Sequence, residues 1–134
     1  MMDLIILTLH KLLGDEANFE IRGVVSTEEE YMSNVKINDK APTITWAEVQ
    51  AKMDELRPKE ALKKLREQRD EKLKQTDKYG LADYPFRSDD QKQAWLDYRW
   101  DLRDLPYNSP NVSIDLETGE LTGVVWPTEP TILF

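Results

Sequence analysis

The sequence predicts an α+β fold in which short β-hairpins flank a central pair of helices. Two capping-box patterns, Thr45–Glu48 and Ser88–Gln91, each open a segment whose apolar residues recur at helical spacing. Turn-rich segments with alternating apolar residues lie before and after these helices. The expected parts are an N-terminal β-hairpin region over 1–43, a helical core over 44–106, and a C-terminal hairpin with an extended tail over 107–134.

Composition excludes several classes of protein. The chain has 134 residues, 40% of them apolar and 33% charged, with a formal net charge of −8 and no cysteine. It suits one small domain without disulfides, for which the cytoplasm is the default compartment. No apolar run approaches the ~18–20 residues of a membrane span, and Asp3 is the wrong flank for a signal peptide. The acidic charge argues against general nucleic-acid binding, because it repels phosphates.

The first expected element is a β-hairpin near the N-terminus. Leu4–Leu9 is a short aliphatic run with β-branched members, and Phe19–Val25 begins with alternating apolar and charged residues. Turn-forming residues at 14–18 separate the two runs, which are therefore expected to pair. His10 falls in the first strand with no serine or cysteine partner pattern, so a structural role is expected for it.

A short helix and a further strand are expected next. Ser26 or Thr27 precedes three glutamates at 28–30, and carboxylates at a helix N-terminus oppose the helix dipole. Those glutamates point in different directions on a helix, which makes them a poor metal site. Val35 and Ile37 fit one more short strand.

The helical core is expected to contain a break. After the Thr45 cap, one apolar stripe holds Trp46, Val49, Met53 and Leu56, and a new stripe starts beyond it. Pro58 lies at the change, where it suits the first turn of a new helix and kinks an old one. We therefore expect a break or a sharp kink near Arg57–Pro58 and a second helix from about Pro58 to Gln75. In that case Pro58→Ala raises helicity.

The second partner of the helix pair follows an aromatic connector. Thr76–Arg87 contains Tyr79, Tyr84 and Phe86, whose rings are expected to pack back on the helices. Ser88 then opens a helix to about Leu105. Its apolar stripe is Trp95, Tyr98, Leu102 and Leu105, while Leu96 and Trp100 lie outside it. So wide an apolar arc indicates a central position or a second surface for a partner.

The C-terminal region is expected to form a second hairpin and a tail. Val112–Leu116 alternates, residues 117–120 form a turn, and Leu121–Trp126 returns. The prolines at 127 and 130 lack the donor of a strand ladder, so the tail is expected to be extended, near polyproline II. Ile132, Leu133 and Phe134 would be its apolar anchors.

No residue set predicts catalysis, a metal or a cofactor. The chain has no glycine-rich phosphate loop. Asp101 and Asp104 with Arg99 and Arg103 look like a mixed-charge helix face, without a visible pocket for acid–base chemistry. We expect a protein that is not an enzyme.

Three motifs in order give the chain a family resemblance. The first is Arg-Asp-x-x-Leu-x-x-Thr-Asp at 69–77, and the last is Val-Val-Trp-Pro-Thr-x-Pro at 124–130. Between them lies a helix with Trp95, Tyr98, Arg99, Leu102, Arg103, Asp104 and Pro106. Over roughly residues 44–130 the chain resembles the phage tail assembly chaperone-like family of tailed phages, which also occurs at the end of tail-fibre proteins. Hairpins like the N-terminal one also precede this domain in marine phage proteins. The chain departs from the family pattern at Lys78, where an aromatic is usual, and in an insertion at 108–123.

The resemblance implies a protein that acts by contact with a phage tail, baseplate or tail-fibre protein, in the host cytoplasm during assembly. It would be an assembly chaperone or, alternatively, a structural component retained in the virion tail; homo-oligomers stay open. A third interpretation is a helical regulator that binds acidic partners or nucleic acid through the basic helix at 57–75, and such binding would be sensitive to salt. Trp, Tyr and Arg contribute disproportionately to interfaces. The expected partner-binding residues are Trp95, Tyr98, Arg99, Trp100, Arg103 and Trp126.

Overall fold

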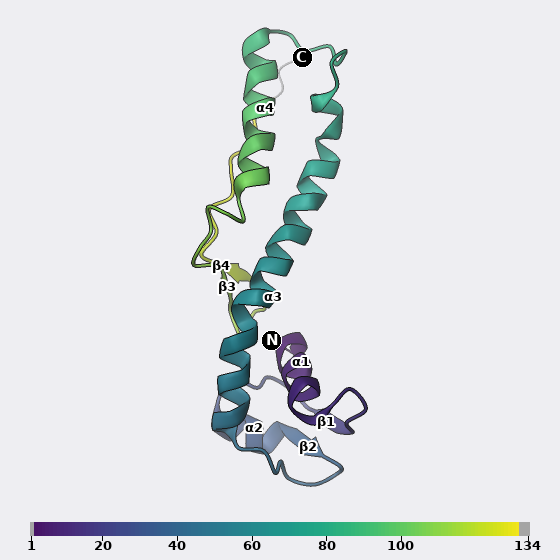
Figure 1. Ribbon diagram of the computed structural model, residues 1–134, viewed down its shortest axis with the longest axis vertical. Coiled ribbons are helices and arrows are strands. Elements are labelled where there is room, and N and C mark those ends of the chain that lie inside the picture. Colours follow the sequence, from purple (N-terminus) through teal and green to yellow (C-terminus); the bar gives the residue numbers. More distant parts are fainter. Residues whose placement is uncertain (1, 132–134) are drawn as a thin grey trace. The chain divides into compact units, whose positions relative to one another are not determined.

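The computed structural model describes residues 2–131, which form an α+β protein with four α-helices and two small antiparallel sheets (Figure 1). The helices are α1 (Met2–Leu13), α2 (Glu28–Asn34), α3 (Trp46–Gln75) and α4 (Asp89–Asp104), with a 3-10 helix η1 (Asp77–Gly80) before α4. The strands are β1 (Phe19–Ile21), β2 (Val35–Ile37), β3 (Ser113–Ile114) and β4 (Leu121–Thr122). Of the described helices, none is both long enough and apolar enough to cross a membrane.

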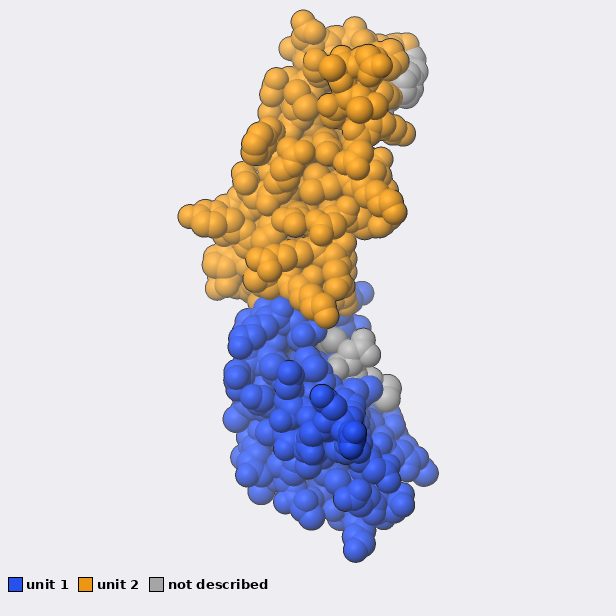
Figure 2. Space-filling view, turned by 45° about the vertical axis from the view of Figure 1, so that its right-hand side comes forward, with its two compact units in different colours: residues 1–61, 113–122 blue, residues 62–112, 123–134 orange. Residues whose placement is uncertain are grey.

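The chain folds into two compact units, shown in different colours in Figure 2. Unit 1 contains residues 1–61 and 113–122, and unit 2 contains residues 62–112 and 123–134. Helix α3 begins in unit 1 and ends in unit 2, and the β3–β4 hairpin belongs to unit 1.

The N-terminal run is a helix, so the expected hairpin of Leu4–Leu9 with Phe19–Val25 is wrong. Leu4, Ile5, Thr8 and Leu9 are all buried, at the spacing of one helix face. The Thr8 hydroxyl donates to the Leu4 carbonyl at 2.7 Å, as in helices. Helix α1 ends at Leu13, and the next residue, Gly14, has a φ of +101° in the left-handed region and donates its N–H to the His10 carbonyl. His10 therefore lies on a helix.

Strand β1 finds its partner elsewhere in the chain. It pairs antiparallel with β2, in a register that places Phe19 opposite Ile37 and Ile21 opposite Val35. The expected strand at Val35 and Ile37 is thereby confirmed. The helix between the strands begins as expected, because the Thr27 hydroxyl accepts the Glu30 N–H at 3.2 Å.

The core of unit 1 collects one face from each of these elements. Its buried members come from α1, the segment before α2, α2, β2 and the first part of α3: Leu4, Ile5, Leu9, Val25, Tyr31, Val35, Ile37, Val49, Met53 and Leu56. The Tyr31 hydroxyl donates to the Ile44 carbonyl at 2.8 Å, which fixes the chain just before α3. The capping box at Thr45 is confirmed, since its N–H donates to Glu48 and its hydroxyl accepts the Glu48 N–H.

Helix α3 passes through Pro58 as one continuous helix, so a break at Arg57–Pro58 and a separate second helix are wrong, while the alternative of a sharp kink there stays a prediction. Proline lacks the N–H that the carbonyl one turn earlier would normally accept, which costs about 3 kcal/mol in a helix interior. Leu56 and Ala61, on either side, are both buried. Burial of these side chains offsets the local cost of the proline, whose ring faces solvent.

The remaining elements begin and end near their expected positions. Ser88 caps α4 by accepting the Gln91 N–H at 3.1 Å, and the helix ends within a residue of the expected position. The C-terminal hairpin is confirmed but short, because only Ser113–Ile114 and Leu121–Thr122 pair. Asp115 shapes its turn by accepting the N–H groups of residues 117 and 118. The anchors proposed at 132–134 lie outside the described residues.

Because the helix is already continuous, Pro58→Ala is expected to stabilise the protein with little change in helicity. The free energy of unfolding should rise by about 1–3 kcal/mol, as the alanine restores a helical hydrogen bond. Urea denaturation followed by circular dichroism measures both quantities, and Lys59→Ala, at the next exposed position, is the control. A clear rise in helicity would instead indicate that the helix is broken at Pro58 in the wild-type protein.

Candidate partner-binding surface

An aromatic core holds the helices of unit 2 together. Its buried members are Tyr79, Trp95, Tyr98 and Leu102, and Leu73, Tyr84, Phe86 and Trp126 pack against them. Tyr79 from η1 stacks on Trp95 of α4 with ring centroids 4.0 Å apart, and Tyr84 meets the edge of Tyr79 at 4.9 Å. The connector rings therefore pack on the helices, as expected from the sequence.

Arg99 connects the two helices at the centre of this unit. Its guanidinium donates to the Leu73 carbonyl at 2.8 Å, to the Thr76 hydroxyl at 2.9 Å and to an Asp77 carboxylate oxygen at 2.9 Å. The Thr76 hydroxyl in turn donates to the Lys72 carbonyl. We name this arrangement the Arg99 clamp. It gives the Leu73 carbonyl, which already accepts the Thr76 N–H, a charged donor and so holds α4 against the end of α3.

The clamp changes the reading of α4. Arg99 is 7% exposed, so it belongs to the interior and not to a mixed-charge face shared with Asp101 and Arg103. A second, more peripheral link has the same form. Arg69 is held by Asp70 and donates to the Arg103 carbonyl at 3.3 Å.

The six expected partner-binding residues separate into three groups. Trp95, Tyr98 and Arg99 are buried together and form the interior of unit 2. Trp100 remains 59% exposed on α4, and the Arg103 guanidinium lies over its ring, 5.3 Å from the centroid. This cation–π contact preorders both side chains at the surface. Trp126 is intermediate, because it packs on the aromatic core and keeps part of its surface in solvent.

Trp126 belongs to the segment 123–131, which we call the strap. Gly123 starts it with a φ of +73°, and a Cβ there would lie 2.2 Å from the Asn111 carbonyl oxygen. Only glycine fits so close an approach. Farther along, the Lys72 ammonium lies 5.3 Å from the centroid of the Trp126 ring. The strap is thus held against the rest of unit 2 at Gly123 and at Trp126.

A cleft opens between α4, the turn after it and the strap. It has a volume of about 300 Å³. Its lining residues are Asp101, Leu105, Asn108, Gly123, Val125, Trp126 and Pro127. The lining combines apolar carbon with one carboxylate and one amide, which suits the side chains of a protein ligand. Trp100 and Arg103 lie outside this lining, so the cleft and the Trp100–Arg103 pair are separate features of one unit.

Two exposed apolar residues were missed by the sequence reading. Val125 is 87% exposed at the edge of the cleft, and Tyr107 is 90% exposed just after Pro106. Neither residue belongs to the apolar stripe of a helix. Tyr107 follows Pro106, and Val125 precedes Trp126, whose backbone is restricted by Pro127. That local signal marks them as residues without a core partner.

Charge divides unevenly between the two units. Unit 1 carries seven basic and fifteen acidic side chains, a net charge of −8, whereas unit 2 carries eleven of each and is neutral. The whole net charge of the chain therefore resides in unit 1. Within residues 2–131, no three metal-ligating side chains form a group that could hold a metal ion.

Arg99→Lys is expected to lower the free energy of unfolding by about 2–3 kcal/mol. Lysine cannot reach the carbonyl, the hydroxyl and the carboxylate at once, and the Arg99 side chain is only 9% exposed. Asp77→Asn is the control, because that side chain is 67% exposed and its ion pair should contribute less than about 1 kcal/mol. If both variants lose the same free energy of unfolding in urea denaturation, the ion pair with Asp77, and not the other contacts of Arg99, provides the stability of the clamp.

Tyr98 makes the stability of the protein depend on alkaline pH. Burial, and to a lesser degree the charge of Glu129, raises the pKa of the Tyr98 phenol above its ordinary value of 10.0. The folded protein therefore holds this proton more tightly than the unfolded chain. The contribution is fully present below about pH 10 and is lost as the pH rises through the folded pKa.

Tyr98→Phe should accordingly lose less stability than the wild type between about pH 9 and pH 11. Melting temperatures across this range measure the difference. Part of the loss should persist, because burial also raises the pKa of Tyr31 in unit 1. Tyr107→Phe, at an exposed position, is the control; an equal effect of both variants would contradict the assignment to Tyr98.

Comparison with known proteins identifies the family. The family model described as phage tail assembly chaperone protein matches residues 62–131, just over half of the chain. The match starts at Leu62, the first residue of unit 2, and not near residue 44 as the resemblance suggested. It includes the Arg99 clamp, the aromatic core and the strap. No curated protein and no solved structure matches the chain significantly. The chain belongs to the phage tail assembly chaperone family.

Proposed function

We propose that this protein binds a phage tail or tail-fibre protein directly during assembly, through the surface of unit 2. The contact would be made by the Trp100–Arg103 pair and by the cleft beside Trp126 and Val125. In this proposal the protein is an assembly chaperone that works by protein contact, without catalysis, in the host cytoplasm.

The exposure of Trp100 is the observation that supports this proposal most strongly. Trp100 is a large side chain that is 59% exposed, so a partner that covers it would remove much apolar surface from water. Arg103 lies over the same ring, and Trp with Arg is a frequent combination at the centres of protein interfaces. Both residues lie in the part of the chain that matches the family.

The neutral charge of unit 2 fits a protein partner better than nucleic acid. Phosphate backbones are bound by a surplus of Lys and Arg, and this unit has none. Its exposed large apolar side chains, Leu81, Trp100, Tyr107 and Val125, favour burial against another protein surface. A tail, baseplate or tail-fibre protein is therefore the partner we propose.

The principal alternative is that the protein stays in the virion as part of the tail, baseplate or fibre. Mass spectrometry of purified particles separates the two roles. A chaperone that leaves is absent from particles but is recovered with a tail protein from infected cells. Stoichiometric presence in particles would contradict the departing role and favour the structural one.

Trp100→Ala is expected to weaken partner binding about tenfold or more, because it removes an interface aromatic. Its melting temperature should stay close to that of the wild type, since the side chain makes its main contact with Arg103 at the surface. The partner is first identified by pull-down from phage-infected lysate and then titrated as purified protein.

Two variants serve as controls for Trp100→Ala. Tyr107→Ala removes another exposed aromatic of unit 2, and Trp95→Ala removes a buried one. We expect Trp95→Ala to lower the melting temperature strongly, as large-to-small core changes do. If Trp100→Ala lowers the melting temperature but leaves binding intact, its side chain is structural and the proposed interface is wrong.

A further inference from the structure

A groove in unit 1 lies outside the part of the chain that matches the family. We propose that this groove, between the end of α1 and the first part of α3, binds a basic, apolar segment of a partner protein. This site is independent of the surface proposed in unit 2, because all of its residues precede Leu62.

The groove is formed by two turns of α3 opposite the end of α1. It has a volume of about 550 Å³ and is lined by Leu12, Leu13, Thr43, Ile44, Glu48, Ala51, Lys52 and Glu55. The four α3 residues follow the spacing i, i+3, i+4, i+7, so they form one strip about 10 Å long on a single helix face. Such a strip matches a helical or extended segment.

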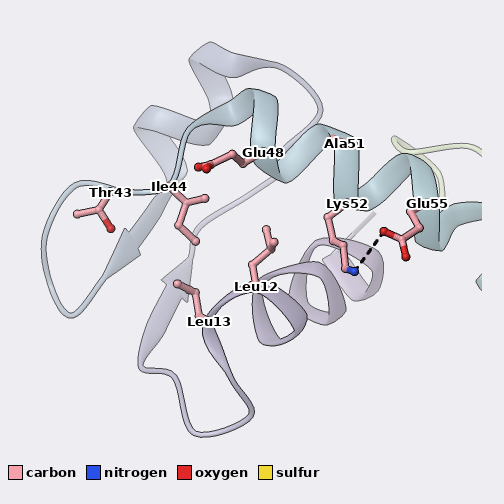
Figure 3. A pocket seen from close by; sticks show the side chains of 8 residues that line it. All are labelled: Leu12, Leu13, Thr43, Ile44, Glu48, Ala51, Lys52 and Glu55. Atoms are coloured by element: carbon pink, nitrogen blue, oxygen red, sulfur yellow. Dashed lines mark hydrogen bonds and ion pairs between the residues drawn. The ribbon is translucent and has the colours of Figure 1, made fainter.

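The bottom of the groove is apolar. Figure 3 shows the side chains of Leu12, Leu13 and Ile44 between α1 and the start of α3. The exposed Ala51 of α3 also lines the groove. Leu12 is 36% exposed, and Leu13 and Ile44 are half-buried. A small alanine on the facing helix leaves room for a leucine-sized side chain to cover these groups, which would remove apolar surface from water.

The edge of the groove is acidic. Glu48 and Glu55 provide two carboxylates. Lys52 forms an ion pair with Glu55, in which its ammonium nitrogen lies 3.2 Å from the carboxylate oxygen. Glu48 accepts only the Thr45 N–H and makes no ion pair with a basic side chain of the described chain. A negative charge therefore remains at the edge for a cationic side chain of the ligand.

The surroundings extend this preference over a longer range. Unit 1 carries the entire net charge of −8. A field of that sign raises the rate at which basic segments arrive and repels acidic ones, most strongly at low salt. The groove thus has an apolar bottom, an acidic edge and acidic surroundings. Together these features favour a ligand segment with neighbouring apolar side chains and a Lys or Arg beside them.

The test uses a fluorescent synthetic peptide of leucine and lysine with its leucines at helical spacing. It is titrated into the full-length protein by fluorescence anisotropy. We expect saturable binding that weakens as salt is added. Ala51→Arg should reduce the affinity about tenfold, because it fills the groove and adds a positive charge.

Two matched variants separate the groove from the general charge of unit 1. Gln50→Arg makes the same gain of a basic side chain at an exposed α3 position outside the groove. Glu55→Gln, in the groove, is likewise compared with Asp54→Asn, outside it. The proposal predicts that only Ala51→Arg and Glu55→Gln weaken binding, while all four variants keep the wild-type circular dichroism.

Four results would overturn the proposal. They are no binding of the leucine–lysine peptide at low salt, equal effects within each matched pair, and equal binding of a serine–lysine or a leucine–glutamate peptide. The fourth is a self-associated wild-type protein that Ala51→Arg makes monomeric in sedimentation, since the occupant would then be a second copy. Because no variant here touches unit 2, failure of this site leaves the Trp100 interface unaffected.

Discussion

The guanidinium of Arg99 is the buried polar link between the end of α3 and α4 in unit 2. It reaches from α4 to the Leu73 carbonyl, the Thr76 hydroxyl and the Asp77 carboxylate, and so closes the end of α3 with side-chain donors. With α4 held there, Trp95 stacks on Tyr79 and the connector rings close over them. The residues that carry the family motifs are largely those that make or support these contacts. Their first role is to shape the unit.

This arrangement explains why some aromatic residues are available to a partner and others are not. Neighbours on α4 have opposite roles, since Arg99 points into the clamp and Trp100 lies in solvent under Arg103. The strap adds Trp126 and Val125 on the cleft side, fixed at its start by the close approach of Gly123 to Asn111. Unit 2 is neutral and unit 1 strongly acidic. The two units therefore differ chemically in the surfaces that they present.

The sequence allowed correct prediction where the signal was local. The caps at Thr27, Thr45 and Ser88 and the Asp115 turn each depend on residues within a few positions of one another. The strand predicted at Leu4–Leu9 is wrong because a short, continuous apolar run does not distinguish a strand from a helix. Gly14 caps the end of that helix, although a glycine there is equally typical of a hairpin turn. The break predicted at Pro58 is wrong because the packing of neighbouring side chains outweighs the preference of proline for a helix end. Arg99 was placed among the partner-binding residues, but its burial was missed because its acceptors lie 22–26 residues away.

Hydrogen–deuterium exchange of the full chain, free and bound to a purified tail protein, tests the central claim most directly. That claim is that unit 2, held in shape by the Arg99 clamp, presents the partner surface. We predict protection on binding at residues 100–107 and 123–127, with the amides of η1 and the end of α3 already protected in the free protein. Binding without added protection at 100–107 and 123–127 would contradict the account.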